Sequence, residues 1–169
     1  MKSRIKIRDK NKIPQAVRAS QELDGKRIKV GVLQDGQIGM IAAVQEFGAN
    51  VPVTPKMRGY LASQGLFLKA TTTQIRIPER SYIRAGWDQN EPDIVQKYAD
   101  LLGKAVANGV SPDALLDALG LESQGALQRF ARDLSSPANH PFTVEQKGSS
   151  NPLVDTGNLI ASIEYDITN

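Results

Sequence analysis

The tripeptide Asp155-Thr156-Gly157 is the stretch of the chain whose residue types most suggest catalysis. A carboxylate in such a setting hydrolyses peptide bonds when it shares a proton with a second carboxylate around one water. The chain carries the motif once, so the second carboxylate has to come from another copy of the chain. The motif therefore raises the question whether Asp155 does chemistry or builds local structure.

Three features favour a structural role for Asp155. Aspartic proteases with a single motif need much sheet after it, including a flap over the substrate, and only twelve residues follow Gly157 here. Those proteases normally have Ala or Ser where this chain has Asn158. Asp155 is also a good helix N-cap, because its carboxylate can accept a hydrogen bond from a free backbone N–H. We therefore predict a loop-to-helix junction in which Asp155 is the cap and Gly157 permits a tight turn.

Other residues that could do chemistry are scarce. The chain has no cysteine, which excludes disulfides, thiolate metal sites and cysteine nucleophiles. Its single histidine, His140, lies in the polar stretch "SSPANHPF" and is expected to be an ordinary loop residue. The sequence lacks the spacing of a phosphate-binding loop and of a metal-ligand cluster. These observations predict a protein that is not an enzyme and that holds no cofactor and no metal.

Composition places the chain among ordinary globular proteins, with 40% apolar and 23% charged residues over 169 positions. No apolar run is long enough to span a bilayer. The net charge of +3 is unevenly distributed, because residues 1–31 hold ten Lys/Arg and three Asp/Glu. Such an imbalance is typical of a solvated basic segment, and also of contact with nucleic acid or an acidic protein surface.

The first third of the chain predicts alternating strands and helices. Residues 1–10 alternate apolar and basic side chains, which predicts a basic extended arm or edge strand with Ile5 and Ile7 on its apolar edge. The stretch "IPQAVRASQELDG" has helical spacing, and "KRIKVGVLQDG" alternates like a strand. The stretch "IGMIAAVQEFGAN" predicts a helix that ends near Gly48, where a left-handed conformation suits glycine.

The central stretch is rich in Pro, Gly and Thr. It predicts two short strands near residues 57–62 and 65–70, joined by a turn at Ser63-Gln64-Gly65, and then an extended "QIRIP".

A helical segment is predicted around residues 91–134, with Ser111 as the N-cap of its second helix and Gly120 as an interruption. A polar loop follows, and "IASIEYDI" predicts a last strand that closes the sheet. The expected fold class is α+β, with a small, mostly antiparallel sheet packed with helices in a single domain over residues 1–169.

Three motifs stand in order along the chain: "AAVQEFGA" at 42–49, "IPERSYIRAGWD" at 77–88 and "PLVDTGNLIASIEYDI" at 152–167. Together they resemble the head–tail joining or tail-completion proteins of tailed bacteriophages, including the virion-morphogenesis proteins of Mu-like phages. Tyr82 replaces the usual Phe of that family, and Asn158 replaces its common Arg or Lys. The match covers the start, middle and end of the chain.

The resemblance implies a tail-terminator-like fold and a structural subunit of the virion neck. Such proteins assemble as rings, often hexameric, that complete the head-proximal end of the tail and meet its tube, its terminator and the connector or stopper proteins. The expected location is the head–tail junction of the virion, after synthesis in the host cytoplasm. Membrane contact and a small-molecule substrate are not expected, whereas contact with DNA in the lumen is. The alternative is a DNA-binding accessory protein that uses the basic arm.

The matched positions are structural or interface candidates. Pro78 restricts Ile77 to an extended conformation. Arg80 and Arg84 share a face if a helix begins here, and one of them could pair with Glu46 or Asp155 in the chain, or with a neighbouring subunit. The interface candidates are Ile5, Ile7, Arg80, Tyr82, Arg84 and Trp87. The structural candidates are Glu46, Phe47, Gly48, Pro78, Asp155, Thr156 and Gly157.

Overall fold

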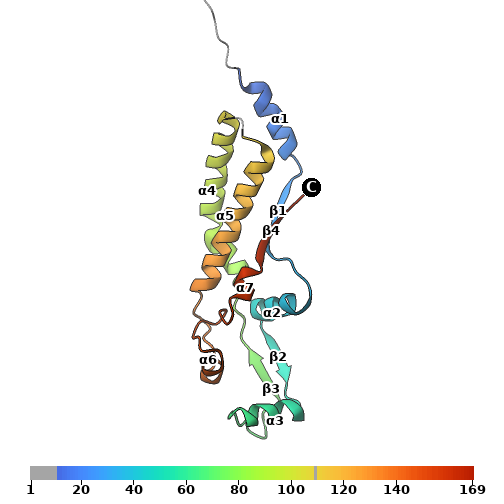
Figure 1. Cartoon of the computed structure of the whole chain (residues 1–169), viewed down its shortest axis with the longest axis vertical. Helices are drawn as coiled ribbons and strands as arrows, with labels where there is room; N and C mark the ends of the chain where they lie inside the picture. Colours follow the sequence, from blue (N-terminus) through green and yellow to red (C-terminus); the bar gives the residue numbers. More distant parts are fainter. Residues whose placement is uncertain (1–10, 109) are drawn as a thin grey trace, which may run out of the picture.

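The computed structural model describes residues 11–108 and 110–169, and it shows an elongated α+β fold (Figure 1). The predicted arm at residues 1–10, with Ile5 and Ile7, lies outside the described residues. The elements in chain order are α1 (Ile13–Leu23), β1 (Arg27–Val32), α2 (Gly36–Phe47), β2 (Ala49–Pro52), α3 (Pro55–Ser63), β3 (Gln74–Ile77), α4 (Arg84–Asn108), α5 (Pro112–Asp133), α6 (Pro141–Lys147), α7 (Asn158–Ala161) and β4 (Ile163–Thr168).

A pair of long helices, α4 and α5, forms the body of the molecule. Ser111 caps α5 as expected, because its Oγ accepts a hydrogen bond from the Ala114 backbone N–H at 3.3 Å. The helix α4 begins at Arg84, before the predicted start, and contains Pro92 in its interior. A proline has no N–H, so the carbonyl of Asp88 one turn earlier has no helical donor at that position.

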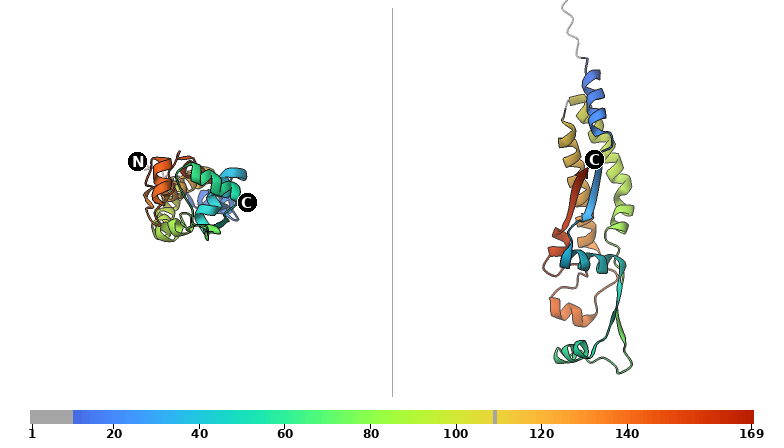
Figure 2. Two further views of the ribbon diagram at one scale, coloured as in Figure 1. Left: turned by 90° about the horizontal axis from the view of Figure 1, so that it is seen from below. Right: turned by 90° about the vertical axis from the view of Figure 1, so that its right-hand side faces the viewer.

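Gly120 does not interrupt α5, which runs unbroken from Pro112 to Asp133. The glycine serves a close approach instead, since a Cβ at this position would lie 2.3 Å from Cδ2 of Tyr165 on β4. The strand β4 pairs antiparallel with β1, with Val30 opposite Tyr165, and this two-stranded ribbon lies along α5 (Figure 2). The sequence pattern indicates only that glycine weakens a helix. It does not indicate that the Tyr165 ring needs the space at this position.

The expected single sheet is in fact two separate two-stranded antiparallel sheets, β1–β4 and β2–β3. The predicted strands near 57–62 and 65–70 are wrong, because α3 occupies the first range and the second has no regular structure. Thr54 caps α3 by accepting from the Met57 N–H at 3.1 Å, and Pro55 occupies the first turn. The extended "QIRIP" prediction is confirmed as β3, with Ile77 at its end.

Two apolar clusters fill the body among the described residues. The smaller one joins Ala105, Leu115 and Leu119 to residues of α1 and β1 near one end of the helix pair. The larger one lies where α2, α4, α5, α7 and the chain before α7 meet. None of the helices in the described ranges is long and apolar enough to cross a membrane. The expectation of one domain over residues 1–169 stays a prediction.

Residues 49–78, comprising β2, α3 and β3 with their connections, extend from one end of the body (Figures 1 and 2). We call this segment the finger. None of its residues is buried. Its two strands pair with Ala49 opposite Ile77 and Pro52 opposite Gln74.

Candidate functional site

The three sequence motifs meet in the larger apolar cluster, although they are far apart in the chain. Ala42 comes from the first motif, Tyr82 from the second and Leu153 from the third. The residues after Gly157 enter the core, with Ile163 fully buried. We call this meeting point, with the polar groups around it, the junction. Its contributing buried side chains are Ala42, Tyr82, Leu127, Ala131, Leu153, Leu159, Ile160 and Ile163.

Glu46, near the end of α2, holds the start of α4 at the junction. Its carboxylate is buried and accepts from the backbone N–H groups of Ile83 at 2.9 Å and Arg84 at 3.1 Å. It also accepts from Ser81 Oγ at 3.1 Å. The first turn of a helix leaves its N–H groups without helical partners and carries a partial positive charge. Glu46 therefore acts as a cap supplied by a distant part of the chain.

Arg84 completes this arrangement from the solvent side. Its Nε donates to Glu46 Oε1 at 3.0 Å, its Nη2 donates to Glu79 at 2.8 Å, and its guanidinium lies 4.7 Å from the Phe47 ring centroid. The hydrogen bond to Glu46 raises the pKa of Arg84 above its ordinary value. The prediction that one of the two arginines pairs with Glu46 is thus confirmed for Arg84. Because half of its side chain is exposed, Arg84 stays available as an interface candidate.

Arg80 is buried, so the expectation that it faces a partner is corrected. Its Nε donates to the Pro137 carbonyl at 2.8 Å, and its Nη1 donates to Gln45 Oε1 at 2.8 Å. Its Nη2 donates to Asn139 Oδ1 at 3.0 Å and more weakly to the Ala138 carbonyl. Burial lowers the pKa of Arg80. The planar guanidinium joins α2 to the chain that precedes α6, a task that uses donors in several directions.

The prediction that Tyr82 is an interface residue is also corrected, because Tyr82 lies in the core and is only 1% exposed. Its burial, together with the charge of Glu46, raises the pKa of its hydroxyl. Trp87 is half-buried and packs against the same cluster. Gly48 has a φ of 72°, and a Cβ there would lie 2.9 Å from both Glu79 N and Ile77 O. Gly48 is therefore needed for conformation and for the close passage of the chain before Pro78.

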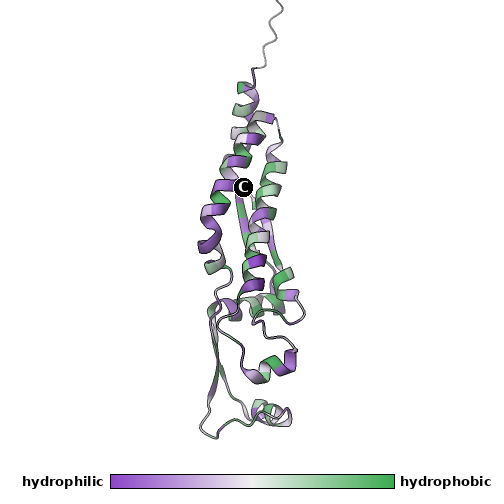
Figure 3. Cartoon of the chain, turned by 90° about the vertical axis from the view of Figure 1, so that its left-hand side faces the viewer, coloured by the Kyte–Doolittle hydropathy of each residue, from purple (hydrophilic) through white to green (hydrophobic). Residues whose placement is uncertain are grey.

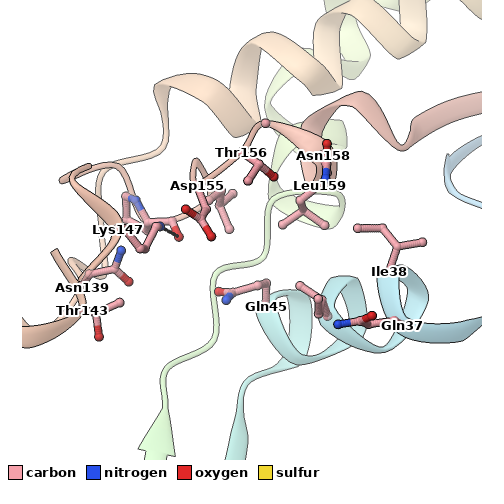
Figure 4. Close-up of a pocket in the computed structure, with 14 residues that line it drawn as sticks. Gln37, Ile38, Gln45, Asn139, Thr143, Lys147, Asp155, Thr156, Asn158 and Leu159 are labelled. Atoms are coloured by element: carbon pink, nitrogen blue, oxygen red, sulfur yellow. Dashed lines mark hydrogen bonds between the residues drawn. The ribbon is translucent and has the colours of Figure 1, made fainter. Parts of the chain in front are cut away.

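A pocket of about 470 Å³ opens beside the Asp-Thr-Gly motif, between α2, α6 and the chain before α7. Figure 4 shows Asp155 and Lys147 on one side of it and Gln37 and Gln45 of α2 on the other. Lys147 donates to the carbonyls of Asn151 at 3.1 Å and Pro152 at 3.3 Å. Burial lowers the pKa of Lys147, and the charge of Asp155 acts in the opposite direction.

Asp155 is not the helix cap, so this prediction is corrected. The N-cap of α7 is Gly157, with a φ of 84°, and no side chain accepts a hydrogen bond there. Asp155 and Thr156 are exposed. The turn just before this segment is held by Asn151, whose Oδ1 accepts from the N–H groups of Leu153 at 2.9 Å and Val154 at 3.1 Å. The prediction of a tight turn at Gly157 is confirmed.

The pocket has limited means for acid–base chemistry. Asp155 is the one carboxylate among the residues that line it, whereas hydrolysis by paired aspartates needs two. His140 caps α6, where its Nδ1 accepts from the Phe142 N–H at 3.2 Å, and so it is part of a helix start. No group of three or more His, Cys, Asp or Glu within the described ranges could hold a metal ion.

Several junction residues were missed by sequence reasoning. Gln45, Asn139, Lys147 and Asn151 supply side-chain contacts that hold the loops around α6 and α7. The stretch from His140 to Lys147 carried the signal of a helix, because a proline follows its N-cap and Gly148 with positive φ ends it. It lay inside a stretch expected to be loop.

The chain matches no protein-family model, no curated protein and no solved structure at a significant level. At the junction, the polar residues of the sequence motifs hold elements of the fold together. Glu46 and Arg80 both form their hydrogen bonds with other parts of the chain.

Proposed function

We propose that this protein is a structural subunit of the neck of a tailed bacteriophage, where it completes the head-proximal end of the tail and joins it to the connector as a ring. The observation that carries the proposal is the convergence of the three motifs in one junction. Residues of one motif bind residues of another, as Glu46 of the first motif binds the start of α4 in the second. A set of motifs that specifies a scaffold fits a structural subunit better than a catalyst.

The shape of the chain supports the same proposal. A body held by two apolar clusters carries a finger with no buried residue, which reaches away from that body (Figure 1). Exposed apolar and charged side chains on a projecting segment favour contact with other proteins. Asp155 and Thr156, exposed at the rim of the pocket, add a second accessible surface at the same end of the body.

The experiment is to assemble particles in cells that lack this protein and to image them by electron microscopy. Heads and tails should accumulate unjoined, or the tails should vary in length. Supplying the intact protein should restore joined particles that carry density for it at the head–tail junction. Normal joined particles without the protein would refute the proposal. Tight, salt-sensitive binding of the isolated protein to duplex DNA, with normal joining, would favour the DNA-binding alternative.

A further inference from the structure

The finger displays two large aromatic side chains in solvent. Phe67 is 78% exposed and Tyr60 is 63% exposed, although both residue types are usually at least half covered when they lie in a folded domain. Figure 3 shows hydrophobic and hydrophilic residues side by side along this segment. Aromatic side chains are enriched at the centre of protein–protein contacts, whereas polar and charged side chains are typical of the rim.

The loop that carries Phe67 is held in place. The Arg58 guanidinium donates to the carbonyls of Leu68 at 3.1 Å, Lys69 at 3.0 Å and Thr72 at 2.7 Å. One side chain thus fixes the path of the chain after α3. A surface that is ordered before binding loses less conformational entropy when a partner arrives, so it binds more tightly for the same contacts.

The charged residues of the finger are all basic. Residues 49–78 contain four basic residues and no acidic one. Of these, Lys56, Lys69 and Arg76 are exposed and form no salt bridge within the described part of the chain. A matching partner therefore needs negative charge beside an apolar surface that can cover Phe67 and Tyr60.

The outer face of α4 has both properties. Residues 85–102 contain four acidic residues and one basic residue, Lys97, which pairs with Glu122 of α5. Five exposed side chains follow one face at spacings of three or four residues, which is the repeat of a helix. We call this face the α4 stripe; it consists of Asp88, Glu91, Val95, Ala99 and Leu102.

The apolar half of the α4 stripe is unusually open. Val95 is 54% exposed and Leu102 is 43% exposed. A cavity of about 300 Å³ adjoins Leu102 and is lined also by Ser20, Leu23 and Asp24 of the α1 end. The stripe thus offers acidic groups at one end and an apolar surface beside a cavity at the other.

We propose that the finger of one copy docks on the α4 stripe of a second copy, with Phe67 and Tyr60 on the apolar half and the basic residues near Asp88 and Glu91. The inference rests on the proposed function, since a ring needs a repeated contact of this kind. The two surfaces are different patches, so a docked pair still has one free finger and one free stripe. Such a head-to-tail contact builds a closed ring or an open filament. Duplex DNA matches the basic charge but offers no apolar surface for Phe67.

The first test uses two variants and sedimentation velocity at increasing concentration. The finger variant is Tyr60→Ser with Phe67→Ser, and the stripe variant is Asp88→Lys with Glu91→Lys. All four positions are exposed, so the fold should persist, as circular dichroism will show. Each variant alone should associate at least about thirtyfold more weakly than the intact chain. Leu121→Ser, at an equally exposed apolar position on α5, is the matched control and should associate normally.

Mixing the two variants gives the sharpest result. Their mixture contains one intact finger and one intact stripe for each pair, so it should form a one-to-one dimer that cannot grow. A two-fold symmetric contact between two fingers, or between two stripes, would give no such dimer. Undiminished association of both variants would overturn the inference. So would a finger variant that associates normally but loses binding to duplex DNA, which would assign the finger to nucleic acid.

A second measurement, disulfide crosslinking, tests the contact even if the isolated chain is monomeric. The sequence has no cysteine, so Phe67→Cys in one chain and Val95→Cys in another provide the sole thiols. When both chains are present during particle assembly, mild oxidation should give a disulfide-linked dimer, and a Phe67→Cys with Leu121→Cys mixture should not. Absence of the first dimer in assembled particles would overturn the inference. Normal joining of heads and tails by the finger variant would count only against docking by the finger. Normal joining in cells that lack this protein would refute the proposed function itself.

Discussion

The junction and the finger use the same residue types for opposite purposes. At the junction, Glu46 and Arg80 are buried and every contact they make is to another part of the chain. On the finger, Lys56 and Arg76 are exposed and have no ion pair among the described residues. Charged side chains therefore have two roles in this protein. Buried ones hold the fold together, and exposed ones are available to a partner.

The physical reason is the cost of desolvation. A charged group inside a protein must replace its lost hydration with hydrogen bonds. Removing one partner therefore leaves the remaining buried donors or acceptors unsatisfied. An exposed charge keeps its water and contributes little to stability until a partner covers it. Substitutions at the junction should therefore affect folding, and those on the finger should affect association.

Glu46→Ala should have the largest effect on stability. It removes the acceptor for the N–H groups of Ile83 and Arg84 and leaves Ser81 without its partner. The free energy of unfolding should fall by about 3 kcal/mol, the range for breaking a buried charged network. Urea denaturation followed by circular dichroism measures the loss. Glu46→Gln keeps an acceptor oxygen and should lose less; an equal loss would mean that the charge alone matters.

Arg80→Met should rank second. The substitution keeps a long apolar side chain but leaves Gln45 Oε1 and the carbonyls of Pro137 and Ala138 without their donor. We expect a loss of about 2 kcal/mol and faster hydrogen exchange in the chain before α6. Arg84→Met, at a half-exposed position beside it, is the matched control and should cost less. Equal costs for the two would remove the distinction between buried and exposed arginine.

Arg58→Ala should lower global stability by less than about 1 kcal/mol, because no finger residue is buried. Its effect should be local, since three carbonyls between Leu68 and Thr72 lose their common donor. Limited proteolysis and hydrogen exchange should show a more open loop after α3, with the body unchanged. Global unfolding at a lower denaturant concentration, with loss of body protection, would show that the finger supports the body.

Asp155→Ala should have the smallest effect, within about 0.5 kcal/mol, because the carboxylate is exposed and caps no helix. Asn151→Ala is the informative comparison, because the Asn151 side chain accepts from two N–H groups in the turn just before Asp155. This substitution should cost about 1 kcal/mol. Thermal denaturation of the pair checks the order. A larger loss at Asp155 would restore its capping role, and a peptidase activity abolished by the substitution would revive the protease hypothesis.

Local patterns were reliable where short-range chemistry decides. Alternation identified β1 and β4, helical spacing identified α1 and α2, and the cap at Ser111 placed the start of α5. They failed where a segment carried two competing signals. The stretch after Pro52 is rich in Gly and Thr, which suggested strands, but the Thr54-Pro55 start gave a helix.

The sequence by itself determined the α+β class, the tight turn at Gly157 and the extended conformation of Ile77 before Pro78, because each depends on backbone preferences of a few neighbouring residues. Tertiary structure alone decided that Gly120 makes room for Tyr165 and that Arg80 is buried. It also decided that Asn151 holds the turn at residues 151–154 and that Asp155 caps no helix. Burial and hydrogen-bond partners are set by residues distant in the chain, so no local pattern contains them.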